Sequence, residues 1–429
     1  MVAAVCSLAF LAYPGTAVNP FLGAAVVTAL VLVVAAADAL VGTAPGLFEI
    51  QRRHPPVVVA GREAELRWTV RSGAARRVVL EVADSPAPSL RARSRRFRVV
   101  IPRNSVANVT TTFEPMRRGH FVLDRVALRI HGRLGLGARQ REVPLRTELR
   151  VHPPFRSARE AELRIRRARI LEVGTRSARG LGGGTEFEQL REYGPDDEFR
   201  RIDWTATARV GKPVVRTYRA ERNQRVLVLL DNGRVMAGRV GGVPRVEHAM
   251  DAAMMLTAVA TRLGDRCGMV AFDTEVRSVV PPARRSDQLA RVTEAMYALE
   301  PALSESDYSG AFTEVVSRFR RRAMLVVVSD LLEQAVTDSL VPALPLITRT
   351  HLVVVAGVTD PAVDAWARGP VADDDEVFRR VAAVRALQTR RRAAAQLSAL
   401  GAIVIDAPPG RLAVDLADAY LQVKTTGRL

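Results

Sequence analysis

The order of hydrophobic and polar residues changes along the chain, and each change predicts a different kind of structure. Residues 1–50 hold no Lys or Arg and contain two apolar runs, 1–13 and 20–37, with turn-forming residues between them. The second run is about long enough to cross a hydrocarbon core of roughly 30 Å. We therefore expect a transmembrane hairpin or a single anchor over residues 1–50.

The charges beside the second run predict its orientation. Arg52 and Arg53 are the first basic residues of the chain, and many arginines follow them. By the positive-inside rule, the chain beyond the anchor is expected in the cytoplasm, with the anchor in the plasma or inner membrane. A cleaved signal peptide is the alternative, but it would have a basic start and a shorter apolar stretch.

Residues 51–155 have the short alternating pattern of an all-β domain. In the segment 121–130 apolar residues alternate with polar ones, and this alternation shifts by one residue between Asp124 and Arg125. The shift predicts a β-bulge there. Pro- and Gly-containing breaks separate the strands, and this spacing favours a β-sandwich. The expected strands are 57–60, 65–70, 77–83, 96–101, 107–113, 121–130 and 142–152.

The rest of the chain divides into residues 156–224 and residues 225–429. The first part begins with a basic amphipathic helix over 156–172, in which Leu163 and Ile170 lie at helical spacing. We expect this helix to pack along a domain edge or against lipid headgroups. In the second part strands alternate with helices, which is typical of a doubly wound sheet. The expected strands are 226–230, 267–272, 323–329, 350–358 and 402–405, with 276–280 as an antiparallel edge.

Three aspartates are expected at the carboxyl edge of this sheet, where ligands bind in such folds. Asp231 and Asp330 directly follow strands, and Asp307 lies in the loop before a helix. Converging carboxylates repel one another unless a cation lies between them, and Mg²⁺ prefers such ligands. The alternative is that each aspartate caps a helix or orders a turn. No cofactor follows with certainty, and Mg²⁺ is the candidate.

The loop at Asp231 resembles the metal-ion-dependent adhesion site of von Willebrand factor A domains, which reads Asp-x-Ser-x-Ser. This chain has Gly233 and Val235 at the two serine positions, and neither supplies a hydroxyl ligand. The guanidinium of Arg234 is the alternative occupant, because it would neutralise the carboxylates without an ion. The site is therefore expected to be altered or metal-free.

A dense mixture of acidic, basic and aromatic residues lies before the doubly wound region. It reads GTEFEQLREY from Gly184, PDD from Pro195, RRIDW from Arg200 and TAR from Thr207. The pattern predicts an ion-pair network with aromatic packing, which forms either a structural clasp or a partner-binding surface. Its candidate residues are Glu186, Phe187, Glu188, Arg191, Glu192, Tyr193, Asp196, Asp197, Arg200, Asp203, Trp204 and Arg209.

This motif closely resembles the signature of a bacterial family known only as a domain of unknown function, number fifty-eight in its series. The resemblance continues through the Asp231 loop to the segment 420–424, and residues 117–153 look like the family's β-domain. It implies an α/β chain with a membrane anchor, a β-sandwich and a von Willebrand factor A-like domain. It also implies partnership with MoxR-type AAA+ ATPases, often beside transglutaminase-like membrane proteins.

Composition narrows the functional classes. The net charge is +18, and apart from Lys212 and Lys424 the basic residues are arginines. Because these arginines are spread without aromatic interleaving, zinc spacing or a helix-turn-helix pattern, attraction to an anionic membrane is favoured over nucleic-acid binding. The chain lacks a Gly-x-Ser-x-Gly elbow, a P-loop and an HExxH motif. The expected function is a non-enzymatic membrane adaptor for a MoxR-type ATPase or its clients. The alternative is a metal-dependent sensor or hydrolase that uses Asp231, Asp307 and Asp330.

Overall fold

The computed structural model describes residues 20–178, 186–195, 197, 199–219, 224–331 and 336–427. The chain divides into two compact units, Met1–His152 and Pro153–Leu429. The first apolar run, residues 1–13, lies outside the described residues.

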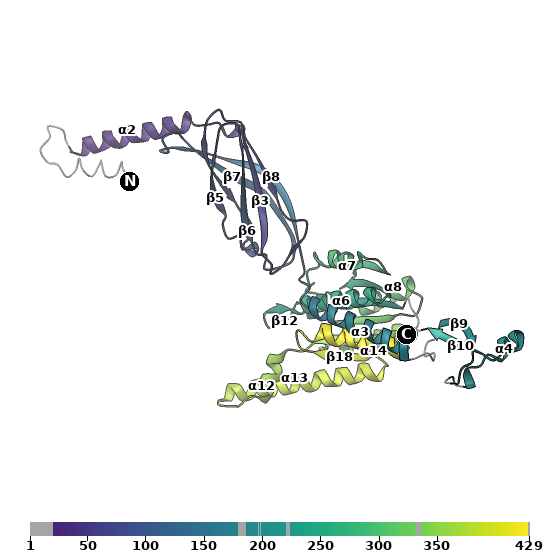
Figure 1. Ribbon diagram of the computed structural model, residues 1–429. Helices are drawn as coiled ribbons and strands as arrows, with labels where there is room; N and C mark the ends of the chain where they lie inside the picture. The colour runs from purple at the N-terminus through teal and green to yellow at the C-terminus, as the bar shows by residue number, and fades with distance from the viewer. Residues whose placement is uncertain are drawn as a thin grey trace. The chain divides into compact units, whose positions relative to one another are not determined.

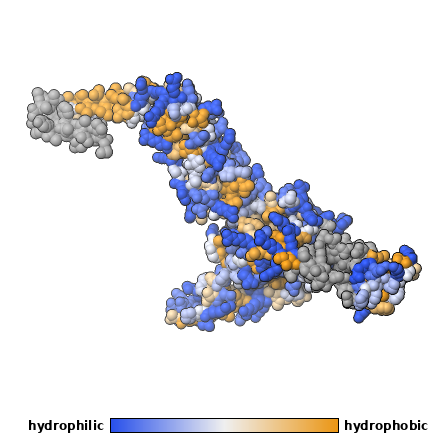
Figure 2. All heavy atoms as spheres, in the orientation of Figure 1, coloured by the Kyte–Doolittle hydropathy of each residue, from blue (hydrophilic) through white to orange (hydrophobic). Residues whose placement is uncertain are grey.

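The second apolar run forms helix α2, Pro20–Leu40 (Figure 1). Its 21 residues extend about 31 Å at 1.5 Å per residue. Large side chains such as Phe21, Leu30 and Val33 are more than 60% exposed, and Figure 2 shows α2 as an apolar surface. By length and composition this helix can cross a membrane.

Two antiparallel sheets share the hydrophobic core of the first unit. One has the strand order β1-β3-β6, and the other has the order β2-β8-β7-β4-β5, in which the short β2 is parallel to β8. The predicted bulge is confirmed, because the register of β7 and β8 shifts between Leu123 and Arg125. The strands are β1 (Phe48–Arg53), β2 (Val58–Val59), β3 (Ala64–Ser72), β4 (Val78–Asp84), β5 (Arg96–Ile101), β6 (Val106–Phe113), β7 (Gly119–His131) and β8 (Ala138–His152).

Strand β1 was not predicted, and it changes the role of Arg52. The side chain of Arg52 is fully buried and donates to both carboxylate oxygens of Asp84 at 2.8 Å. It also donates to the carbonyl oxygens of Leu123 and Leu145. Arg52, the first basic residue after α2, is therefore buried in an ion pair inside the first unit and does not face lipid headgroups.

The second unit is built on a six-stranded sheet with the order β15-β14-β11-β16-β17-β18. Numbered by their order along the chain within this sheet, the strands run 3-2-1-4-5-6, which is a doubly wound order. All neighbours are parallel except β14 and β15, so the predicted antiparallel edge is confirmed. The strands are β11 (Arg225–Asp231), β14 (Arg266–Phe272), β15 (Val276–Ala283), β16 (Met324–Val328), β17 (Leu352–Val358) and β18 (Ile403–Ala407).

Helices cover both faces of this sheet and enclose two hydrophobic cores. One core is shared with α6 (Arg245–Arg262), α7 (Gln288–Met296) and α14 (Leu412–Thr426). The other is shared with α8 (Tyr308–Arg318), α11 (Pro345–Thr348) and the end of α13 (Asp374–Ala399). Helix α12 (Pro361–Arg368) packs along α13.

Helix α3, Ala158–Ala178, confirms the predicted basic helix but not its packing face. Ala161 and Ile165 are buried and join the core around α6. Leu163 and Ile170, the expected apolar positions, are 65% and 70% exposed.

Candidate functional site

Asp231 lies at the carboxyl end of β11, between the ends of two parallel neighbours, and is wholly buried. Its Oδ1 accepts hydrogen bonds from Ser306 Oγ at 2.5 Å and from the Gly233 N–H at 2.8 Å. Its Oδ2 accepts from Ser329 Oγ at 2.5 Å and from Tyr308 Oη at 2.6 Å. A carboxylate has about four lone-pair positions. The protein therefore satisfies this carboxylate with its own donors.

Burial keeps Tyr308 in the form that can donate. Burial is the largest cause that raises the phenol pKa well above its ordinary value, and the negative charge of Asp231 adds to it. The phenol is consequently protonated at neutral pH. Phe272 and Phe312 pack edge-on against its ring and fix its position.

The absence of a serine at position 233 has a steric explanation. A Cβ atom at Gly233 would lie 2.1 Å from Ser306 Oγ, which is too close for any side chain unless Ser306 moves. A hydroxyl donor to Asp231 comes instead from Ser306, on another loop.

Asp330, at the end of β16, is neutralised by two arginines. Its side chain is fully buried and forms ion pairs with Arg390 Nη1 at 2.6 Å and with Arg245 Nε at 3.0 Å. Arg390 also contacts both oxygens of Asp406 at 2.7 Å, which joins α13 to β18. Although burial opposes its charge, the hydrogen bond to Asp406 and the charge of Asp330 raise the pKa of Arg390.

Asp307 and Arg234, which were also predicted to take part in this site, do not contact Asp231 or Asp330 in the structure. Asp307 is exposed and caps α8 through a 2.9 Å hydrogen bond from the Gly310 N–H. Arg234 is exposed and donates to Glu305 at 2.7 Å. The expectation that Arg234 places its guanidinium among the carboxylates is therefore wrong, because Arg245 and Arg390 take this role at Asp330.

The predicted magnesium site is not assembled in the part of the chain that the structure describes. Within it, no group of three or more His, Cys, Asp or Glu side chains is placed to hold a metal ion. The hollow lined by Ser306 and Tyr308 holds about 10 Å³, which is close to the volume that admits one water. Asp231 orders its loop and Asp307 caps a helix, as the alternative expects, whereas Asp330 does neither and pairs with two arginines.

Magnesium is consequently expected to leave the stability of the protein unchanged. Thermal unfolding of the full chain in detergent would be compared in millimolar MgCl₂ and in EDTA, with NaCl matched for ionic strength. Because Asp231 and Asp330 already have internal donors, the melting temperatures should coincide. A rise that is specific to Mg²⁺ and absent from Asp231→Asn would contradict this interpretation.

The described part of the predicted motif forms a small module held by strands β9 (Glu186–Glu192) and β10 (Val214–Arg219). Arg191 donates to both carboxylate oxygens of Asp197, whose side chain is 3% exposed, and the Gly194 N–H donates to the same group at 2.8 Å. Asp203 caps helix α4 (Trp204–Val210) by accepting from two backbone N–H groups. These residues form the predicted clasp.

The aromatic residues of the module lie at its surface. Trp204 is 60% exposed and Phe199 is 67% exposed, and their rings meet edge-on with centroids 5.5 Å apart. Tyr193, Arg200 and Arg209 are exposed as well. Phe199 was not among the predicted residues, although it lies within the motif. Arg191 and Asp197 are thus paired within the module, while Phe199 and Trp204 lie at its surface.

The remaining residues of the predicted motif are either exposed or outside what the structure describes. Glu192 is exposed and pairs with Lys212 at 3.1 Å. Asp196 lies outside the described residues. The side chains of Glu186, Phe187 and Glu188, on β9, also lie outside what the structure describes.

Comparison with known proteins gives a family without a known role. The profile of a family described as "Protein of unknown function DUF58" matches residues 189–399. Uncharacterized proteins of Mycobacterium tuberculosis and Mycobacterium bovis are 28% identical over 182 residues, which is 42% of this chain. The aligned part spans 56% of the length of these relatives.

Solved structures add little to this assignment. A PapD-like domain of human CEP192 is 14% identical, with a TM-score of 0.20, and covers 25% of this chain and 89% of that domain. Proximal thread matrix protein 1 from the mussel byssus is 10% identical, with a TM-score of 0.28, and covers 48% of each chain. Both scores are low, and neither likeness carries an inference about this protein.

Proposed function

Because this chain belongs, through residues 189–399, to the DUF58 family of proteins of unknown function, we propose its function from the geometry of its sites. The proposed function is a membrane-anchored adaptor that binds a partner protein. Helix α2 is the anchor, the two sheets of the first unit form a β-sandwich, and the second unit is a von Willebrand factor A-like domain. The doubly wound strand order and the buried Asp231 loop support this last interpretation.

The observation that carries the adaptor proposal is the exposed pair Phe199 and Trp204 on a module held by internal ion pairs. Large aromatic side chains that remain exposed in contact with each other cost hydrophobic free energy unless a partner covers them. Trp is enriched among the residues that dominate binding energy at protein interfaces. The clasp through Arg191 and Asp197 fixes this surface in advance, which lowers the entropic cost of binding.

The carboxyl edge of the sheet favours binding over catalysis. Asp231 and Asp330 are occupied by internal partners, and the adjoining hollow has room for about one water. A sensor or hydrolase acting through Asp231, Asp307 and Asp330 would need these carboxylates to open toward a ligand. The adaptor proposal requires only that this edge be a stable scaffold.

The partner proposed from the family resemblance is a MoxR-type AAA+ ATPase, or a client of that ATPase. Arg53 follows α2, and residues 1–50 contain no basic residue, which supports a cytoplasmic orientation of both units. A cytoplasmic ATPase would then meet the adaptor at the membrane surface.

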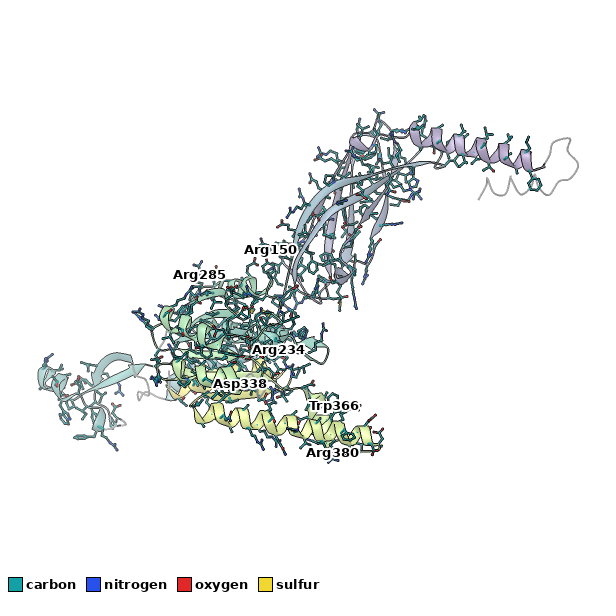
Figure 3. All side chains as sticks on the ribbon, turned by 180° about the vertical axis from the view of Figure 1, so that it is seen from behind. Arg150, Arg234, Arg285, Asp338, Trp366 and Arg380 are labelled. Carbon is teal, nitrogen blue, oxygen red and sulfur yellow. The ribbon has the colours of Figure 1, made fainter. Side chains whose placement is uncertain are left out.

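Replacement of Trp204 by alanine is expected to weaken partner binding by about 2 kcal/mol, or roughly 30-fold in Kd, as for a central interface tryptophan. The measurement is the affinity of the full chain, in detergent or nanodiscs, for the cognate MoxR-type ATPase with ATP and Mg²⁺. Trp366→Ala is the matched control, since Trp366 is 48% exposed and lies on α12 (Figure 3). Both variants should melt like the wild type, because neither side chain is buried.

The possible outcomes test the proposed partner and the proposed contact residues separately. No binding by the wild-type chain would reject the ATPase as partner. Binding that both variants retain would reject the aromatic pair as the contact. A loss confined to Trp366→Ala would place the contact on α12 and α13 instead.

A further inference from the structure

The turn between β7 and β8, residues 132–137, is fastened to the last turns of α2. Asp38 of α2 accepts hydrogen bonds from the N–H groups of Leu134 at 2.9 Å, and of Leu136 and Gly137 at 3.1 Å. A Cβ atom at Gly137 would lie 2.1 Å from the Ala35 carbonyl oxygen. The turn therefore lies directly against the helix at Ala35 to Asp38.

Five N–H groups of this turn have acceptors within the protein. Besides the three N–H groups that donate to Asp38, the Gly132 N–H donates to Gly137 O at 2.9 Å and the Gly135 N–H donates to Gly132 O at 3.3 Å. A non-helical backbone segment is tolerated at membrane depth only when its polar groups have internal partners. These N–H groups meet that condition.

The side chains of the turn combine exposed leucines with arginines. Leu134 is 67% exposed and Leu136 is 55% exposed. Arg133 and Arg139, on either side of them, are exposed too. Apolar side chains bordered by basic ones are the pattern of segments that enter the boundary between headgroups and acyl chains of anionic membranes.

The position of the turn along α2 gives its depth. Ala35 lies five residues before Leu40, the end of α2, which corresponds to about 8 Å along the helix axis. Interfacial elements typically enter a membrane by roughly 5–10 Å. If the 21 residues of α2 span the hydrocarbon core, the turn lies at this boundary.

We propose that the turn 132–137 is a second membrane contact, in which Leu134 and Leu136 enter the lipid and Arg133 and Arg139 meet anionic headgroups. The proposal rests on α2 being the membrane anchor. The occupant of this surface is the bilayer, because the exposed leucines belong to a turn that is held against the exposed apolar helix α2 and the flanking charges are complementary to phosphate. The contact would orient the first unit on the membrane surface.

Depth-dependent fluorescence quenching tests the contact. The full chain, with Cys6→Ser, would carry one new cysteine labelled with an environment-sensitive fluorophore at Leu134 or Leu136. It would be placed in vesicles of phosphatidylcholine and phosphatidylglycerol that contain nitroxide lipids. Cys267 does not interfere, because it is wholly buried and burial raises its thiol pKa to about 12. The unlabelled parent gives the blank.

Two further labelling positions make the result decisive. Val33, which is 65% exposed on α2, reports insertion of the anchor. Met116, which is 48% exposed before the start of β7, is the matched apolar control. Because β7 has 13 residues, Met116 lies about 40 Å from the turn.

We expect blue-shifted emission and strong quenching at Leu134, Leu136 and Val33, and water-like emission at Met116. Quenching at Val33 with water-like emission at both leucines would overturn the turn contact and leave the anchor standing. Water-like emission at all positions would overturn the anchor as well. Equal quenching at Met116 and the leucines would show that the turn has no preference for lipid, and would overturn the proposal too.

Discussion

Arg390→Ala is expected to lower the free energy of unfolding of the second unit by about 3–5 kcal/mol, the usual cost of removing one partner from a buried ion pair. The side chain of Arg390 is 12% exposed, and that of its partner Asp330 is fully buried. The substitution leaves Asp330 with the single ion pair to Arg245, and it removes the donors to Asp406 and to the Val358 carbonyl oxygen. The carboxyl ends of β16, β17 and β18 lose their common link to α13.

The measurement is urea unfolding of the full chain in detergent, followed by far-UV circular dichroism. Arg385→Ala is the matched control, because Arg385 lies on the same helix and is exposed. It should change the stability by no more than about 0.5 kcal/mol. Arg390→Lys should fall between the two, since an ammonium group cannot reproduce the guanidinium fork. A cost below about 1 kcal/mol for Arg390→Ala would mean that Arg245 alone neutralises Asp330, and would contradict the prediction.

The sequence was informative where a local pattern determines structure. Alternation located the strands of the first unit, and the phase change at Asp124 and Arg125 located the bulge. Strand β1 was missed because its six residues, with three charged side chains, lie shortly after an apolar helix and resemble a membrane flank. Its buried Arg52 pairs with Asp84, which is 32 residues away, and with carbonyl oxygens that lie still farther along the chain.

The candidate site shows the same limit. Asp231 and Asp330 each follow an expected strand in the sequence, and this located them correctly at one edge of the sheet, because β11 and β16 are parallel neighbours. It did not reveal their partners. Ser306 lies 75 residues from Asp231, and Arg390 lies 60 residues from Asp330. Among so many arginines, nothing in the sequence distinguishes the one that is buried.

The Asp231 network leads to a second large expected effect. In Asp231→Ala, the hydroxyls of Ser306, Ser329 and Tyr308 lose their shared acceptor. The oxygens of Tyr308 and Ser329 lie 2.8 Å apart, so these two hydroxyls can then hydrogen-bond to each other and part of the network is replaced. Buried hydroxyls left without partners cost about 1–3 kcal/mol each. We therefore expect a loss of about 3 kcal/mol in the free energy of unfolding.

Asp231→Asn separates a structural role of this carboxylate from a metal-binding role. An asparagine can accept from the Gly233 N–H and from Ser306 through its oxygen, and its amide can donate to Ser329 and Tyr308 after their hydroxyls rotate. If Asp231 orders the loop, the asparagine variant should keep most of the stability, within about 1 kcal/mol of the wild type. If Asp231 held a cation, both variants would instead lose the same Mg²⁺-dependent stability. Urea unfolding with Mg²⁺ and with EDTA measures this difference, and a metal-dependent loss in both variants would refute the structural role.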